Sequence, residues 1–169
     1  MPGMDPSEAA GDRAARPNRW PWPPIIVCLT AVAALALNHL APSHGLFPPW
    51  GGTPAVGGAI AAIGLGLDLW AMRTMQRLRA NILPHRAATA LVTTGPFALS
   101  RNPIYLANSL LLAGAGLAFT NLWLLLAALA QAWLVSRLAI RREEVHLAIR
   151  FGDAWMAYAA NVPRWLRLW

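Results

Sequence analysis

The sequence predicts an all-α integral membrane protein with four transmembrane helices, a C-terminal helical hairpin and an amphipathic cytoplasmic helix. Of its 169 residues, 57% are hydrophobic and only 12% are charged, whereas about 25% of the residues in a soluble domain are charged. Four apolar segments approach the roughly 20 residues that a helix needs to cross the hydrocarbon core of a bilayer. All 14 basic residues are arginines, and they flank the apolar segments in a pattern typical of membrane topology.

The N-terminal residues 1–19 are expected to form a disordered cytoplasmic tail, because they contain Pro, Gly and Asp without hydrophobic periodicity. Residues 20–169 are expected to form a single membrane-embedded domain. Its first span covers about residues 24–40, after an arginine group that ends at Arg19. A cleavable signal peptide is the alternative for this segment, although the apolar run is longer than a normal signal-peptide core.

The second predicted span covers about residues 54–72, and small side chains along it favour close packing against another helix. These small residues are Gly57, Gly58, Ala61, Ala62, Gly64 and Gly66. Asp68 lies near the end of the span, five residues before Arg73. It fits two roles, because it is either an interfacial acid paired with that arginine or a polar group lining a site.

The third and fourth predicted spans cover about residues 104–119 and 123–140, and the tight turn Thr120-Asn121 joins them. So short a connection predicts a helical hairpin. After Ile140, apolar residues recur with helical spacing between arginines. This pattern predicts an amphipathic cytoplasmic helix that lies on the membrane surface.

The arginine distribution predicts the topology. With the N-terminus in the cytoplasm and four spans, all 14 arginines fall on the cytoplasmic side, and both short outer connections carry none. We therefore expect a multi-pass protein of a bacterial inner membrane, with both termini in the cytoplasm and membrane lipids as partners. The net charge of +7 follows from this topology, so we do not expect nucleic acid as a partner.

The segment that leads into the third span has the features of a ligand site. Gly95-Pro96 indicates a turn, Asn102 is a typical capping residue, and Pro103 stands at the first position of the helix. Exposed N–H groups at such a helix start can bind an anion. The sequence therefore predicts a charged ligand here.

Two blocks of sequence resemble the isoprenylcysteine carboxyl methyltransferase and phospholipid methyltransferase superfamily. The first block combines Leu91-Val92-Thr93-Thr94-Gly95-Pro96-Phe97 with Arg101-Asn102-Pro103-Ile104-Tyr105-Leu106-Ala107. The second combines Arg142-Glu143-Glu144 with Phe151-Gly152-Asp153-Ala154-Trp155, Tyr158 and Val162-Pro163-Arg164. The resemblance implies an integral-membrane enzyme whose cofactor is S-adenosylmethionine. It implies cofactor contacts at Thr89, Ala90, Leu91, Val92, Phe97, Arg101, Asn102, Pro103, Ile104, Tyr105, Glu143 and Glu144. It identifies no catalytic residue.

The paired glutamates have a second interpretation. On residues alone, Glu143 and Glu144 are typical of a solvated helix face that balances Arg141 and Arg142. The resemblance instead implies that Glu143 contacts the cofactor. Arg101 fits a pair with either glutamate or a contact with lipid phosphate.

The acceptor of the methyl group is expected to be small or lipophilic, with an amine, thiol, hydroxyl or carboxyl group. Ala139 stands where the prenylcysteine enzymes are expected to carry a carboxylate-binding arginine, which disfavours a prenylcysteine carboxyl group. Two alternatives stay open, namely an NADPH-dependent membrane reductase of related architecture and a non-enzymatic membrane protein with a vestigial site. No spacing of Cys, His and carboxylate residues predicts a metal, and Cys28 is the single cysteine.

Overall fold

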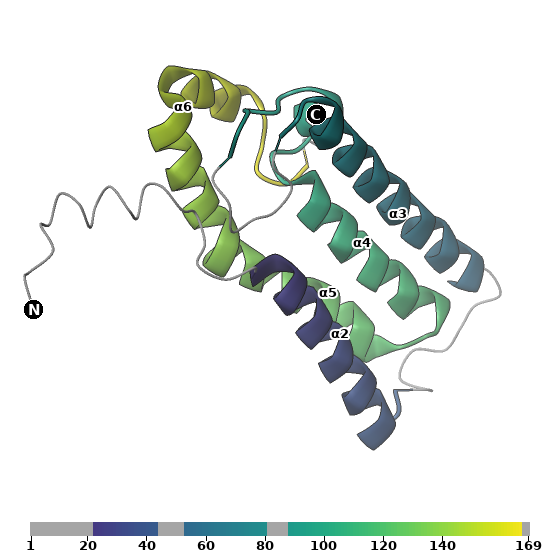
Figure 1. Cartoon of the computed structure of the whole chain (residues 1–169). Coiled ribbons are helices and arrows are strands. Elements are labelled where there is room, and N and C mark those ends of the chain that lie inside the picture. The colour runs from purple at the N-terminus through teal and green to yellow at the C-terminus, as the bar shows by residue number, and fades with distance from the viewer. Residues whose placement is uncertain (1–21, 44–52, 81–87, 167–169) are drawn as a thin grey trace, which may run out of the picture.

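The protein is a bundle of helices, shown in Figure 1 as a computed structural model. The structure describes residues 22–43, 53–80 and 88–166, and within these ranges it contains helices and no strand. The predicted tail at residues 1–19 lies outside the described residues. The all-α prediction is therefore confirmed for the part of the chain that the structure describes.

Four apolar helices form the bundle. They are α2 (Trp22–Leu40), α3 (Thr53–Arg77), α4 (Pro103–Ala118) and α5 (Leu122–Val135). A short π-helix, η2 (Ser136–Ile140), joins α5 without a break to α6 (Arg141–Asn161). By length and composition, three helices can cross a membrane, namely α2, α3 and the continuous helix over Leu122–Asn161, whereas α4 is shorter. The count of four membrane spans stays a prediction.

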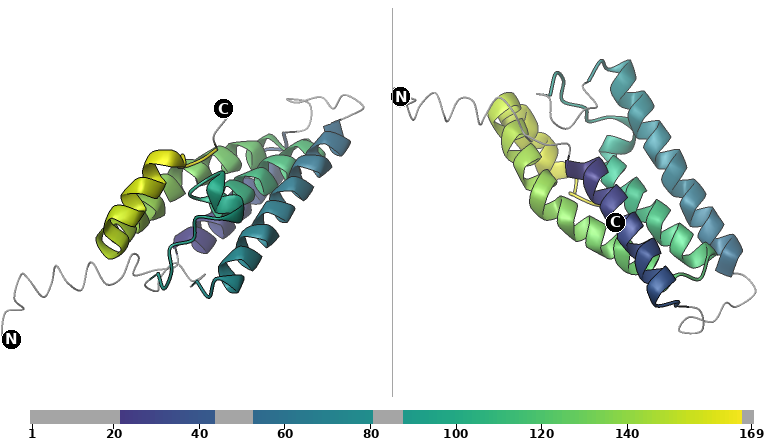
Figure 2. Two further views of the ribbon diagram at one scale, coloured as in Figure 1. Left: turned by 90° about the horizontal axis from the view of Figure 1, so that it is seen from above. Right: turned by 60° about the horizontal axis from the view of Figure 1, so that its bottom comes forward.

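The C-terminal part of the chain continues where a membrane helix was expected to end. The predicted fourth span stops at residue 140, but the helix runs through η2 into α6 because no Pro or Gly interrupts residues 136–144. Figure 2 shows α6 extending the line of α5 before it bends. The bend is at Gly152, whose φ of 50° and ψ of −125° are not helical and are tolerated by glycine.

Close packing joins α3 to α4, as the small residues predicted. A Cβ added to Gly57 would lie 2.2 Å from the backbone nitrogen of Ala118, and one added to Gly64 would lie 2.9 Å from the carbonyl oxygen of Ala107. Gly114 of α4 faces the backbone of α3 equally closely. The expectation does not hold for Gly58 and Gly66, since no atom lies within 4 Å of a Cβ added there.

The connections at one end of the bundle are tied together. The α4–α5 hairpin turns at Thr120, where φ is 49°, and the side chain of Asn121 caps α5 by accepting from the Leu124 N–H at 3.2 Å. The Leu122 N–H donates to Ser43 Oγ, and Trp123 Nε1 donates to the carbonyl oxygen of Ala41. The end of α2 and the start of α5 therefore lie side by side.

Candidate functional site

A cavity of about 480 Å³ lies at the opposite end of the bundle. Residues from α2, α3, α4 and α6 line it, together with the segment that precedes α4. This segment contains a single 3₁₀ turn, η1 (Gly95–Ala98), in which Gly95 adopts a φ of 62° and Pro96 fixes the turn.

Eleven of the twelve residues expected to contact a cofactor line this one cavity. They are Ala90, Leu91, Val92, Phe97, Arg101, Asn102, Pro103, Ile104, Tyr105, Glu143 and Glu144. Thr89 is the exception, because it is not part of the lining and its hydroxyl donates to the carbonyl oxygen of Arg79 at 3.0 Å. The fold thus brings the two sequence blocks together from positions about 40 residues apart.

Glu143 reaches the cavity from the first turn of α6. The hydroxyl of Tyr105, in the first turn of α4, donates to Glu143 Oε1 at 2.8 Å. Tyr105 is buried, so this hydrogen bond holds the carboxylate in a fixed position against the start of α4.

Glu144 has different partners. Arg164 donates to it from Nε at 3.0 Å and from Nη2 at 2.5 Å, and Arg101 Nη1 lies 3.3 Å from Glu144 Oε1. The hydrogen bond with Glu144 raises the pKa of Arg164. Of the contacts that the sequence left open for Arg101, the structure shows the pair with Glu144. Both ion pairs among the described residues join Glu144 to these arginines, not to Arg141 or Arg142.

The C-terminal segment fastens the loop that precedes α4. The Arg101 N–H donates to the carbonyl oxygen of Pro163, and Asn102 Nδ2 donates to the carbonyl oxygen of Arg164 at 2.9 Å. The prediction that the Asn102 side chain caps α4 is therefore wrong, because that side chain is used to bind the C-terminal segment. No side chain caps α4, which leaves its N-terminal end suited to an anionic ligand.

Four polar or aromatic side chains in the cavity lining were not expected to contact the ligand. They are Asn108, His146, Trp155 and Tyr158. Trp155 and Tyr158 belong to the second sequence block, which offered a signal for them, whereas no local pattern marks His146 or Asn108.

Asp68 also lines the cavity. Of the two roles that the sequence left open for it, the structure therefore supports a polar group lining a site. No ion pair of Asp68 with Arg73 occurs among the described residues.

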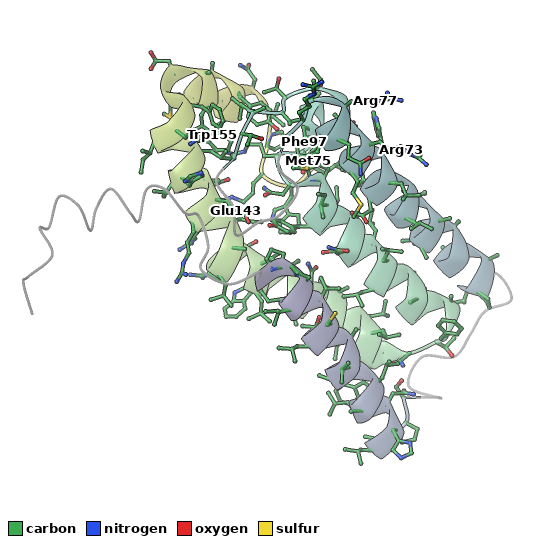
Figure 3. The ribbon with its side chains drawn as sticks, in the orientation of Figure 1. Arg73, Met75, Arg77, Phe97, Glu143 and Trp155 are labelled. Atoms are coloured by element: carbon green, nitrogen blue, oxygen red, sulfur yellow. The ribbon has the colours of Figure 1, made fainter. Side chains whose placement is uncertain are left out.

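Aromatic side chains form one wall of the cavity. The Tyr158 hydroxyl donates to the carbonyl oxygen of Phe97 at 2.7 Å, and the Trp155 and Tyr158 rings meet edge to face with centroids 5.7 Å apart. The Arg101 guanidinium carbon lies 5.5 Å from the centroid of the Trp155 ring. Figure 3 shows Phe97, Met75, Trp155 and Glu143 at the same end of the bundle.

Arg101 retains an unused hydrogen-bond donor. Its Nε atom is buried and has no hydrogen-bond partner, and a buried donor without a partner is unfavourable. A ligand oxygen at this position would satisfy it. Within the described residues, no group of three or more His, Cys, Asp or Glu side chains is placed to hold a metal ion.

Comparisons with known proteins identify sequences related to this chain. The family described as phospholipid methyltransferase matches residues 53–154, which is more than half of the chain. A relative from Alcaligenes xylosoxydans xylosoxydans, named nickel-cobalt-cadmium resistance protein NccN, is 37% identical over 93 residues. That match covers 54% of this chain and 43% of the relative, so the chain spans less than half of the relative's length. No solved structure matches the chain.

Proposed function

The chain belongs to the phospholipid methyltransferase family, and from this premise we propose that it transfers a methyl group from S-adenosylmethionine to a small or lipophilic acceptor at the cytoplasmic face of a membrane. The observation that carries this proposal is that one cavity is lined by eleven of the twelve residues for which the resemblance implies cofactor contacts. Membership of the family supports a membrane methyltransferase. The activity, the cofactor, the acceptor and the side of the membrane are our proposal.

The chemistry of the lining fits S-adenosylmethionine. A cavity of about 480 Å³ lies within the usual range for small-molecule sites. The Glu143 carboxylate suits an ammonium group or ribose hydroxyls. The uncapped start of α4 and the unpartnered Arg101 Nε suit a carboxylate. When bound, the cofactor supplies a methyl group on a positively charged sulfur, and the rings of Phe97 and Tyr105 are suited to lie against that charge.

Apolar residues of α2 and α3 line another part of the cavity. They include Pro24, Val27 and Cys28 of α2 together with Met72 and Met75 of α3. Within the described residues, α2 packs chiefly on α5 and α3 packs chiefly on α4, so no extensive contact closes α2 against α3. We propose that a lipophilic acceptor enters between these two helices, with membrane lipids as its surroundings.

The position of Ala139 supports an acceptor other than a prenylcysteine carboxyl group. Ala139 lies in η2, is completely buried and is not part of the cavity lining. The expected carboxylate-binding arginine therefore has no counterpart at this position. An acceptor without a negative charge avoids leaving a carboxylate unpaired near the membrane.

Calorimetry on the purified protein in detergent tests the cofactor. We expect S-adenosylhomocysteine to bind at one site and NADPH not to bind. Binding of NADPH in place of S-adenosylhomocysteine would support the reductase alternative. Binding of neither compound by protein that keeps its helical circular dichroism spectrum would support a vestigial site.

A further inference from the structure

Asp68 is an acidic residue of the cavity that the proposed cofactor contacts do not use. It lies in α3 and lines the cavity, and its Oδ1 atom is buried without a hydrogen-bond partner. The other two lining carboxylates are engaged, because Glu143 accepts from Tyr105 and Glu144 pairs with arginines. Asp68 forms no such ion pair among the described residues.

The register of α3 against α4 shows where Asp68 lies. Gly64 packs on Ala107 and Leu111 of α4, and Asp68 stands one helical turn later on the same face of α3. The two helices run antiparallel, since Gly57 instead meets Ala118. Asp68 is therefore level with the beginning of α4, where Ile104 and Asn108 also line the cavity.

The neighbours of Asp68 on α3 are suited to a lipophilic molecule. Met72 follows it by one turn and Met75 by two, and both line the cavity. Val27 and Cys28 of α2 line the same cavity. Asp68 is thus a charged group within the apolar part of the lining, through which we propose that the acceptor enters.

The charge of the lining favours a cation. Among the residues that the structure describes, the charged residues of the lining are Asp68, Glu143, Glu144 and Arg101, so three carboxylates face one arginine there. Arg164, which is not part of the lining, provides a second partner for Glu144. A carboxylate at membrane depth is unfavourable unless it is paired, hydrogen-bonded or protonated. A cation beside Asp68 would pair with it.

We propose that Asp68 binds the methyl acceptor as an ammonium ion and accepts a proton from it. This inference rests on the proposed function. Loss of the proton to the Asp68 carboxylate gives the nitrogen a lone pair, which forms the new bond to the methyl carbon. The carbon–sulfur bond breaks and its electron pair stays on sulfur. The products are a methylated ammonium ion, S-adenosylhomocysteine and a protonated Asp68, which then releases its proton to water.

Three probes with the same tail and different head groups test the binding step. Octylamine, octanol and octanoate are titrated into detergent-purified protein that is saturated with S-adenosylhomocysteine. We expect octylamine to bind about tenfold or more tightly than octanol, with octanoate weakest. Asp68→Asn should lower the affinity for octylamine about tenfold. It should change the affinity for octanol little, since only the ammonium ion loses a charged partner. Asp68→Glu should retain the preference for octylamine.

Methyl transfer is measured with the same variants and radiolabelled S-adenosylmethionine. Octylamine and dihexanoyl phosphatidylethanolamine distinguish a free amine from a lipid head group, and methylation of either one that is lost in Asp68→Asn supports the inference. Asp153→Asn is the matched control, because it removes an exposed carboxylate of α6 that is not in the lining.

The outcomes separate this inference from the proposed function. Failure of wild-type protein to bind S-adenosylhomocysteine would contradict the proposed function itself. If wild type and Asp68→Asn bind S-adenosylhomocysteine equally and also bind and methylate the amines equally, the role of Asp68 is overturned and the methyltransferase remains. Methylation of octanol in preference to both amines would also overturn it.

Discussion

At the scale of single residues, Glu143 and Glu144 contact different partners although they are neighbours in the sequence. Successive residues of an α-helix point about 100° apart, so Glu143 meets Tyr105 on α4 while Glu144 meets Arg164 in the C-terminal segment. The sequence motif could predict that both lie near the ligand. It could not predict the partner of each, because Arg164 is 20 residues away from Glu144 and approaches it only after the bend at Gly152.

Alanine substitutions should distinguish the two glutamates. We expect Glu143→Ala to weaken S-adenosylhomocysteine binding by about 1.5–3 kcal/mol, the range for loss of a hydrogen bond to a charged group. Glu144→Ala should affect binding less and lower the stability of the protein by about 1–3 kcal/mol, because it leaves Arg101 and Arg164 without their partner in a partly exposed site. Calorimetry and thermal melts of both variants measure this difference. If neither variant changed binding or stability, both glutamates would instead belong to a solvated helix face.

At the scale of helices, the apolar segments predicted the existence of each helix better than its ends. The predicted span 54–72 corresponds to α3, which continues to Arg77, because a helix can extend past the hydrocarbon core into polar surroundings. The junction of α5 with α6 could not be predicted, since a π-helix such as η2 has no clear sequence signal. Glycine content predicted close packing of α3, but only the structure shows that Gly57 faces α4 and that its neighbour Gly58 does not.

This difference between neighbouring glycines can be measured. A Cβ at Gly57 would lie within 3 Å of backbone atoms of both Gly114 and Ala118, which cannot move without separating the helices. We expect Gly57→Ala to lower stability by about 1–3 kcal/mol, the usual cost of overpacking. Gly58→Ala is the matched control and should change stability by less than about 1 kcal/mol, because its Cβ would meet no atom within 4 Å. Identical melting curves for the two variants in detergent would contradict the close approach of α3 and α4.

At the scale of the whole molecule, the two ends of the helix bundle differ in their arginine content. The end that contains Ala41 and the Thr120 turn carries no arginine among the described residues. At the other end, Arg101 lines the cavity and Arg164 pairs with the lining residue Glu144. Figure 3 shows Arg73 and Arg77 on α3 at the cavity end. The separation of charge was evident from the sequence. The cavity was not, because α2, α3, α4 and α6 each contribute only part of its lining.

Cysteine labelling tests which end faces the cytoplasm. In a Cys28→Ala background, we expect Pro42→Cys and Phe119→Cys to react with an impermeant thiol reagent added outside intact cells, because both positions are exposed at the arginine-free end. Asp153→Cys, exposed on α6, should react only after the cells are opened. Labelling of Asp153→Cys from outside would contradict the predicted orientation and place the cavity on the other side of the membrane.

The hydrogen bonds between the C-terminal segment and the loop before α4 can form only late in the synthesis of this part of the chain. A chain leaves the ribosome from its N-terminus, so the apolar helices emerge before Pro163 and Arg164, whose carbonyl oxygens accept from Arg101 and Asn102. Until those two residues are made, Glu144 also lacks its Arg164 partner. The loop before α4 therefore gains these contacts only after translation has passed Arg164, when the helices that line the rest of the cavity have already been made.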